Sequence, residues 1–221
     1  MLLLLPASAV RASPYWIAYE GNDFPENEGW LRWTGGGGGQ RSIEDGWFVL
    51  DTRASLGIYD YYEKRLGGAL DPGPGETFVM QWRLLVGELQ GRKDPVAGVF
   101  SDEKWAVGFE YASDALWSVF EPGVNYPFEP GIPHTYELRS DDMRTDRLYV
   151  DDLLALEGSF WLSLTSPRVG WGDGIKGAAS LSQWDYVRFG VVPEPATVIT
   201  DVCGLVWIFR RGSRPARDET N

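Results

Sequence analysis

The sequence contains very little of the chemistry that builds covalent or metal cross-links. Its 221 residues include one cysteine, Cys203, and one histidine, His134. A disulfide within the chain is therefore excluded, and so is a zinc site of the usual cysteine and histidine type. A chain of this length can bury enough surface to fold without such cross-links.

Positive charge is also scarce. The chain has 20 lysine and arginine residues against 32 aspartate and glutamate residues, which gives a net charge of −12 at pH 7. Such a charge repels the phosphate backbone of nucleic acids, so we expect no nucleic-acid partner. An acidic surface is compatible with solubility and with the binding of cations or neutral sugars.

The sequence offers no motif for a catalytic nucleophile or a phosphate. No serine- or cysteine-centred nucleophile motif is present, so a structural hydrogen-bonding role is expected for His134. The glycine run at 35–39 precedes no predicted helix and no Lys-Ser/Thr pair, which excludes a phosphate-binding loop. Several carboxylates lie in loop-like segments, where we expect them to be solvated on the surface: Asp23, Glu26, Glu28, Asp102 and Glu103.

Aromatic residues and turn formers are plentiful. The chain has 11 Trp, 10 Tyr and 10 Phe residues, which can supply a large core. It also has 27 Gly and 14 Pro residues, which favour short strands and turns over long helices.

Alternation of apolar and polar residues predicts strands along residues 15–191. The clearest is Thr77–Val86, and Trp105–Tyr111 and His134–Ser140 show the same period of two. Shorter predicted strands are Trp30–Thr34, Trp47–Asp51, Gly57–Arg65, Val96–Ser101, Leu116–Phe120, Arg147–Val150, Leu153–Leu156, Val169–Gly172 and Gln183–Phe189. About a dozen short strands indicate two packed antiparallel sheets, and strand pairing is expected to stop at Gly190.

Three late segments carry a family resemblance. His134–Leu138 (HTYEL) is followed after a charged loop by Leu148–Asp151 (LYVD), and Ser182–Phe189 reads SQWDYVRF. They resemble a hairpin and the closing strand of concanavalin A-like lectin/glucanase and laminin-G-like domains. The resemblance implies an all-β fold, a two-sheet antiparallel jelly-roll sandwich over residues 13–191. Asp152 stands where the family's hairpin turn usually has glycine, which puts a tight turn there in question.

Glucanases of this fold carry catalytic carboxylates on one strand face, spaced as Glu-x-Asp-x-Glu or with one more residue before the last Glu. A retaining pair of this kind lies about 5–5.5 Å apart. No apolar strand predicted here has that spacing, so we expect a protein that is not an enzyme. A secreted glycan-active hydrolase of the same fold remains the alternative.

Lectin-like sandwiches often bind calcium in loops, through carboxylate and carbonyl oxygens. Four aspartates are candidate ligands for a structural calcium ion: Asp141, Asp142, Asp151 and Asp173. Exposed aromatic faces could bind sugars, and the candidates are Trp117, Trp161, Trp171, Tyr59, Tyr61 and Tyr62. Because most aromatic residues must belong to the core, no single one is assigned to glycan binding.

The C-terminal residues 192–221 have the order of a sorting signal. Pro193, Glu194 and Pro195 precede an apolar segment at 196–209, and a basic tail at 210–217 contains Arg210, Arg211 and Arg214. This order resembles the PEP-CTERM signal of Gram-negative bacteria. The resemblance implies processing by an exosortase, transient anchoring in the inner membrane, and delivery to the cell surface or extracellular matrix.

Two features of this tail depart from a full membrane span. As a short hydrophobic helix, the 14 residues at 196–209 would reach about 21 Å, whereas a hydrocarbon core is about 30 Å thick. Asp201 also lies within the segment, which disfavours insertion.

The N-terminal residues 1–12 contain a leucine run followed by Ala-x-Ala spacing, which we interpret as the remnant of a signal peptide. Together these features predict an exported, surface-sorted, non-catalytic protein. We expect it to bind glycan or protein at the cell surface or in the matrix, with extracellular polysaccharide as a candidate partner.

Overall fold

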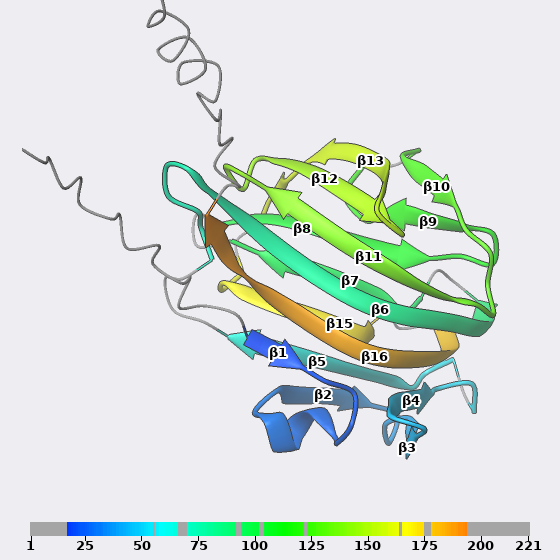
Figure 1. Ribbon diagram of the computed structural model, residues 1–221. Helices are drawn as coiled ribbons and strands as arrows, with labels where there is room; N and C mark the ends of the chain where they lie inside the picture. Colours follow the sequence, from blue (N-terminus) through cyan, green and yellow to red (C-terminus); the bar gives the residue numbers. More distant parts are fainter. Residues whose placement is uncertain are drawn as a thin grey trace, which may run out of the picture.

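The computed structural model describes residues 17–54, 56–65, 70–91, 94–101, 104–121, 123–163, 165–174 and 178–193. These residues form two antiparallel sheets that stack face to face (Figure 1). Sheet A has the order β13 (Leu153–Ser159), β12 (Thr145–Val150), β11 (Pro133–Ser140), β6 (Glu76–Gly91), β16 (Ala178–Pro193), β4 (Trp47–Asp51) and β3 (Gln40–Glu44), and β1 (Ile17–Tyr19) also pairs with β16.

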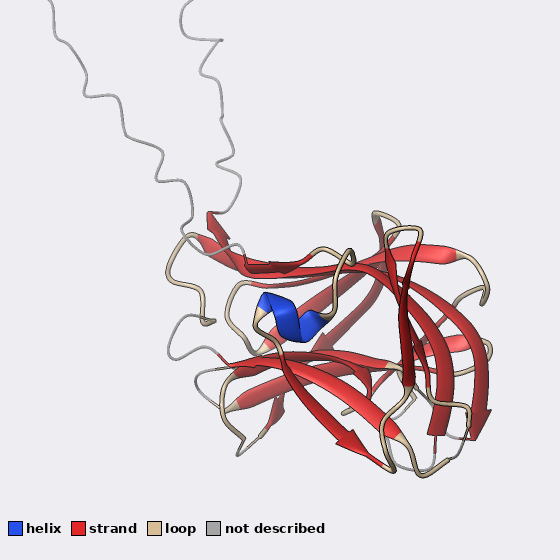
Figure 2. Cartoon of the chain, turned by 90° about the horizontal axis from the view of Figure 1, so that it is seen from below, coloured by secondary structure: helices blue, strands red, loops and turns tan. Residues whose placement is uncertain are grey.

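Sheet B has the order β10 (Asn125–Pro127), β9 (Ala115–Ser118), β8 (Trp105–Tyr111), β7 (Val96–Phe100), β15 (Arg168–Asp173), β5 (Tyr59–Arg65) and β2 (Leu31–Gly35), and β14 (Trp161–Leu162) also pairs with β8. A short 3-10 turn, η1 (Pro25–Glu28), lies between β1 and β2 and is the blue element in Figure 2. Distant strands lie side by side in both sheets: β16 pairs with β6 and β4, and β15 pairs with β7 and β5. The predicted all-β, two-sheet jelly-roll sandwich is therefore confirmed.

Large aromatic side chains fill the space between the sheets. The fully buried Trp171 of β15 stacks on Tyr19 and Tyr62, with ring centroids 5.0 and 4.9 Å apart, and contacts Trp184 of β16 at 4.8 Å. A polar atom buried with such rings needs a partner. The Trp82 indole meets this need by donating a hydrogen bond to the Tyr111 hydroxyl at 2.8 Å.

The strand predictions hold best where one face is buried. Trp47–Asp51 and Trp105–Tyr111 have the predicted bounds, and Thr77–Val86 is the middle of the longer β6. The pattern missed β1, β10 and β14, which have two or three residues and are too short for a period of two to be visible. It also missed the five-residue β3, in which no residue is buried, so no apolar face marks it.

The hairpin between β12 and β13 turns on two aspartates. Asp151 and Asp152 have φ of 49° and 66°, so both occupy the left-handed region that a primed two-residue turn requires. The tight turn therefore forms without glycine, because aspartate tolerates this region better than most residues.

Strand β16 extends further than expected. The prediction that pairing stops at Gly190 is wrong, because Val192 pairs with Thr77 and Pro193 pairs with Glu76. Proline is tolerated at a strand end, where its missing N–H donor interrupts no further ladder. The remainder of the sorting-signal hypothesis, from Glu194 to the basic tail, lies outside the described residues, as does the predicted signal-peptide remnant. Within the described residues, no helix is long and apolar enough to cross a membrane.

Candidate functional site

The outer face of sheet B carries a row of three glycines on neighbouring strands. Gly170 of β15 lies opposite Gly98 of β7, and Gly98 lies opposite Gly108 of β8. Val99, Val107 and other residues at the alternate positions of these strands belong to the core, so the glycines face away from the core. This glycine row leaves a strip of the sheet without side chains.

Each glycine of the row meets different surroundings. A Cβ at Gly98 would lie 2.6 Å from the Val107 carbonyl oxygen, and one at Gly170 would lie 1.6 Å from the Tyr61 hydroxyl. Close approach of backbone or ring to the sheet therefore requires glycine at both positions. A Cβ at Gly108 would meet only ordinary contacts, the nearest being Val119 Cγ2 at 3.4 Å. Packing therefore leaves Gly108 free to vary.

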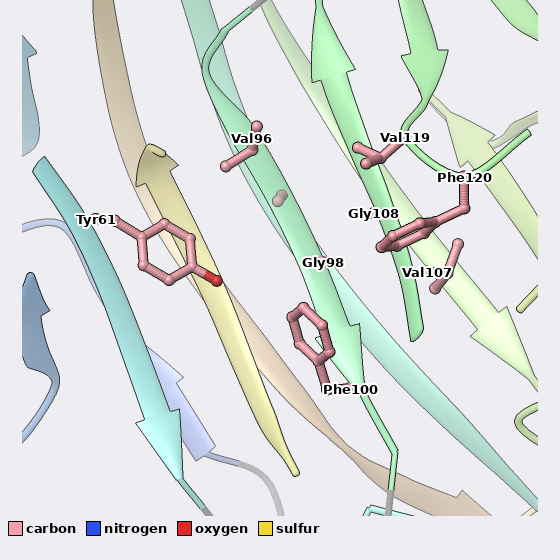
Figure 3. Close-up of a pocket in the computed structure, with 9 residues that line it drawn as sticks. Tyr61, Val96, Gly98, Phe100, Val107, Gly108, Val119 and Phe120 are labelled. Atoms are coloured by element: carbon pink, nitrogen blue, oxygen red, sulfur yellow. The ribbon is translucent and has the colours of Figure 1, made fainter. Parts of the chain in front are cut away.

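A shallow hollow of about 140 Å³ lies over Gly98 and Gly108 of the glycine row, whereas the Tyr61 hydroxyl covers Gly170. Figure 3 shows the Tyr61 ring on one side of it, with Phe100 at one end and Val119 and Phe120 on the other side. Carbon atoms supply nearly all of the hollow's surface. The site is thus an apolar platform with aromatic walls.

Two exposed tryptophans extend this surface on either side. Trp33 of β2 is opposite Tyr61 and is 49% exposed. Trp161 of β14 is opposite Ala106 of β8 and is 59% exposed. Directly opposed residues share a face, so both indoles lie on the outer side of sheet B. Exposed indoles flanking an open hollow are surfaces on which a ligand ring can stack.

A small charged cluster borders the hollow. The buried Glu63 carboxylate accepts from Arg65 at 2.5 Å and lies 3.2 Å from the Arg168 Nε. The Arg168 guanidinium stacks over the Phe100 ring, 4.1 Å from its centroid, and Arg65 lies 5.7 Å from the Trp33 centroid. Burial raises the pKa of the Tyr61 phenol to about 12, and the Arg168 charge acts against this rise. Tyr61 is therefore a neutral hydrogen-bonding group at any physiological pH.

The two carboxylates that the described strands of sheet B place on its outer face are far apart. Glu63 lies in line with the glycine row on β5, whereas Glu110 lies on β8, three strands away. Three strand spacings amount to about 14 Å. Glycosidase pairs are about 5–5.5 Å apart in retaining enzymes and 6.5–9.5 Å apart in inverting ones. The described strands of this face therefore do not bring two carboxylates to the spacing of a glycosidase.

The sequence-based aromatic candidates divide between this face and the core. Tyr61 lines the hollow, Trp161 is exposed beside it, and Trp117 of β9 lies opposite Glu110 on the same face. Trp171 and Tyr62 are fully buried in the core, so the hypothesis that they bind sugar is wrong. Sequence reasoning missed Trp33, Phe100 and the glycine row. The available signal was an isolated glycine inside each of three strands.

The four calcium candidates do not come together. Asp141 accepts hydrogen bonds from Thr77 and Arg147, and Asp142 accepts from the backbone N–H groups of residues 144 and 145. Asp151 binds His134 Nδ1 at 2.6 Å and the Thr135 N–H at 2.9 Å, so His134 has the structural role expected of it. Among the described residues, no three histidine, cysteine or acidic side chains are grouped to hold a metal ion.

Asp173 occupies a different environment, between the sheets. It accepts a hydrogen bond from the Thr52 hydroxyl and lies against Asp94, and both aspartates are fully buried. Burial and the neighbouring Asp173 carboxyl raise the pKa of Asp94 well above its usual value. At neutral pH the pair therefore retains a proton more readily than exposed aspartates do.

Comparisons with known proteins bear on the fold. No family model matches the sequence, and no curated protein matches it. Among solved structures, a carbohydrate esterase from the Shiga toxin-encoding bacteriophage phi24B aligns with a TM-score of 0.59 at 15% identity, covering 80% of this chain and 97% of that one.

Two further structures align over similar lengths. A glycosyl hydrolase family protein from Mycobacterium fortuitum has a TM-score of 0.53 at 12% identity, covering 80% of this chain and 99% of that one. The metal-free carbohydrate recognition domain of Emp46p has a TM-score of 0.50 at 10% identity, covering 80% and 95%. The structural neighbours of this chain are thus proteins of the concanavalin A-like lectin and glycosidase fold, as the hairpin resemblance implied.

Proposed function

We propose that this chain is a non-catalytic glycan-binding protein and that the outer face of sheet B is its binding surface. The observation that carries the proposal is the pair Gly98 and Gly108 of the glycine row, which lie opposite each other beneath an aromatic-walled hollow. The aligned structures, which are a carbohydrate esterase, a glycosyl hydrolase family protein and a carbohydrate recognition domain, support a sugar ligand.

The chemistry of the surface suits a sugar ring. A pyranose has one face of C–H groups, which packs on an aromatic ring, and an edge of hydroxyls, which needs hydrogen-bonding groups. Tyr61, Trp33 and Trp161 supply rings, and the Tyr61 hydroxyl and the Arg65–Glu63 pair supply polar atoms nearby. Binding sites for small molecules commonly combine an apolar lining with a few placed polar groups.

The alternative, a glycan hydrolase, is disfavoured by the separation of Glu63 and Glu110. Positioned acid and nucleophile groups are required for glycoside cleavage, and the two carboxylates on the described strands of this face stand three strands apart. A protein ligand on the same surface is the other alternative, and a glycan-binding assay separates it from the proposal.

The proposal is tested by screening the full-length chain on a glycan array and measuring hydrolysis of every glycan that binds. We expect binding without cleavage. Gly108→Leu should abolish binding with little change in thermal stability, because its Cβ makes only ordinary contacts and its side chain extends into the hollow. Gln81→Leu on the outer face of sheet A is the matched control and should bind as the unaltered chain does. Cleavage of a bound glycan would favour the hydrolase, and no glycan binding at all would overturn the proposal.

We also propose that the chain is exported and sorted by its C-terminal tail, with exosortase processing, transient anchoring in the inner membrane and release at the cell surface or into the matrix. The proposal rests on the sequence order of Pro193–Pro195, apolar segment and arginines. A C-terminal label should be lost from the mature surface protein in a host that carries an exosortase. Replacing Glu194 should block this loss, and a surface form that keeps the label would contradict sorting by this route.

A further inference from the structure

Two arginines stand directly opposite each other at one end of the hollow. Arg65 of β5 pairs in register with Arg168 of β15, and Arg168 pairs with Phe100 of β7, which lines the hollow. Like charges at directly opposed positions destabilise a sheet. Arrangements that break a local rule of stability are expected at functional sites. Arg139 and Arg147 of sheet A are opposed in the same way, so it is the surroundings of Arg65 and Arg168 at the hollow that point to binding.

A single carboxylate lies between the two guanidinium groups. Glu63 contacts both, through one oxygen each, and its side chain is 5% exposed. The three groups together carry a net charge of +1, although the chain as a whole carries −12. Glu63 cannot satisfy all the donors of two guanidinium groups, because each has five N–H donors. The Arg65 side chain is 51% exposed, so part of its hydrogen-bonding edge faces solvent.

The aromatic rings hold both guanidinium groups at the border of the hollow. Arg168 stacks over Phe100, and its charge opposes the rise that burial causes in the pKa of the Tyr61 phenol. The Tyr61 hydroxyl lies over Gly170. A guanidinium group that stacks on an aromatic ring lies parallel to it, so its N–H donors point outward in the plane of the group. A carboxylate can accept two of these N–H groups at once. The Arg168 guanidinium is thus positioned to bind a substituent of a sugar ring that lies in the hollow.

The other end of the hollow has the opposite charge. Glu110 pairs with Val96, which is four residues from Phe100 on β7, a distance of about 13 Å along the strand. An anionic group is therefore attracted to the Phe100 end and repelled from the Val96 end. This polarity orients an acidic sugar and offers no advantage to a neutral one.

From this arrangement, and resting on the proposed glycan-binding function, we infer that the ligand is a carboxylated sugar whose carboxylate binds Arg168 and Arg65 while its ring lies over Gly98 and Gly108. The sugar carboxylate belongs to a uronate or a sialate, since both present the same group. The selectivity arises from the arginine pair and not from the overall charge of the protein, which disfavours anions.

The experiment is isothermal titration calorimetry with the full-length chain at low salt. The probes are tri-galacturonate, the same trisaccharide with its carboxylates methyl-esterified, and 3′-sialyllactose with lactose as its neutral partner. The acid member of at least one pair should bind about 10-fold or more tightly than its neutral partner, as expected for hydrogen bonds to a charged group. Raising the salt concentration should narrow the gap through screening.

Single substitutions test whether Arg168 and Arg65 cause the preference for the acidic probes. Arg168→Met and Arg65→Met should each weaken binding of the acid probe about 10-fold while changing that of its neutral partner less than 2-fold. Arg83→Gln removes an arginine that stacks on Trp47 on the other sheet, and it should change neither affinity. Thermal denaturation of each variant monitors folding, and Arg65, which is half exposed, provides a readout if Arg168→Met fails to fold.

The outcomes separate the two proposals. Equal binding of the acid and neutral probes, or equal losses for both in the arginine variants, would overturn the acidic-sugar inference and leave glycan binding standing. Binding confined to neutral glycans on the array would do the same. Binding of no glycan of any kind would overturn the proposed function and this inference together.

Discussion

The two outer faces of the sandwich are built from similar strands but carry opposite surface chemistry. On sheet A the outward positions hold charged side chains that pair with one another: Arg83 with Asp185, Arg139 with Glu137, and Arg188 with Glu20. On sheet B the corresponding area is occupied by the glycine row and its aromatic walls. A folded sheet needs neither an empty strip nor exposed indoles, and this difference is the reason for proposing the binding surface on sheet B.

The largest expected effect concerns Asp146, which lies where sheet A and sheet B contact each other beside Glu121. Glu121, which follows β9 of sheet B, accepts a hydrogen bond from the Ser159 N–H of sheet A at 3.1 Å. The pKa of Asp146, beside Glu121, is raised to about 7. Burial is the main cause, and the charge of Glu121 adds to it. An acid whose folded pKa is raised contributes stability that is complete below its unfolded pKa, about 3.9, and is lost as pH rises through 7.

Asp146→Asn removes this titration. The unfolding free energy of the variant minus that of the unaltered chain should rise by about 4 kcal/mol between pH 4 and pH 8, which is three pKa units at 1.36 kcal/mol each. Urea denaturation at several pH values measures this difference. Parallel stability curves for the two proteins would show that Asp146 does not titrate in this range.

The next effect distinguishes positions within the glycine row. Gly98→Ala should destabilise the protein by about 2–3 kcal/mol, because its Cβ would press on the Val107 carbonyl oxygen, which is backbone and cannot move away. Gly108→Ala should stay within about 1 kcal/mol of the unaltered chain, since its surroundings admit a Cβ. Chemical denaturation compares the two, and equal losses would mean that the row is needed only for packing.

A smaller effect compares the exposed Trp33 on sheet B with the half-buried Trp47 on sheet A. Trp33→Ala should weaken glycan binding about 10-fold, or about 1.4 kcal/mol, because a stacking surface beside Tyr61 is lost. Trp47→Ala removes an indole from the outer face of sheet A, where it stacks with Arg83, and should leave affinity unchanged. Titration calorimetry with the glycan selected on the array measures both. Loss of affinity in Trp47→Ala alone would move the binding site to sheet A.

The smallest effect is expected from the charges of sheet A. Arg83→Gln breaks an ion pair of 2.8 Å to Asp185 whose side chains are 40% and 27% exposed, and such pairs contribute less than about 1 kcal/mol. Thermal denaturation should therefore detect little change. A loss of several kcal/mol would show that the charged face stabilises the fold far more than surface ion pairs usually do.

Much of this fold was predictable from local pattern, whereas most of the site was not. The alternation in β6 and β8 and the hairpin stretch at β11 and β12 appear in the sequence because one face of each strand is buried. The glycine row depends on the register between β7, β8 and β15, and β15 is more than 50 residues away along the chain. No local pattern specifies such a pairing.

Local pattern also could not separate buried from exposed aromatic residues. Trp171 and Trp161 both lie in short apolar stretches, yet the first is fully buried and the second is 59% exposed. Their difference arises from the position of each strand: β15 is central in sheet B, whereas β14 pairs only with β8 among the described strands. Local pattern also could not show that the calcium candidates already have hydrogen-bond partners: Asp142 accepts from the Arg144 N–H in its own turn, and Asp151 accepts from the Thr135 N–H of β11.

The most direct test of glycan binding on sheet B is the change in backbone amide chemical shifts when the selected oligosaccharide is added to the isotopically labelled full-length chain. The account predicts that the amides of Gly98, Gly108 and Gly170 shift with increasing ligand, whereas those of Gln81 and Glu137 on the outer face of sheet A do not. Shifts concentrated at Gln81 and Glu137, with the glycine row unchanged, would contradict the account.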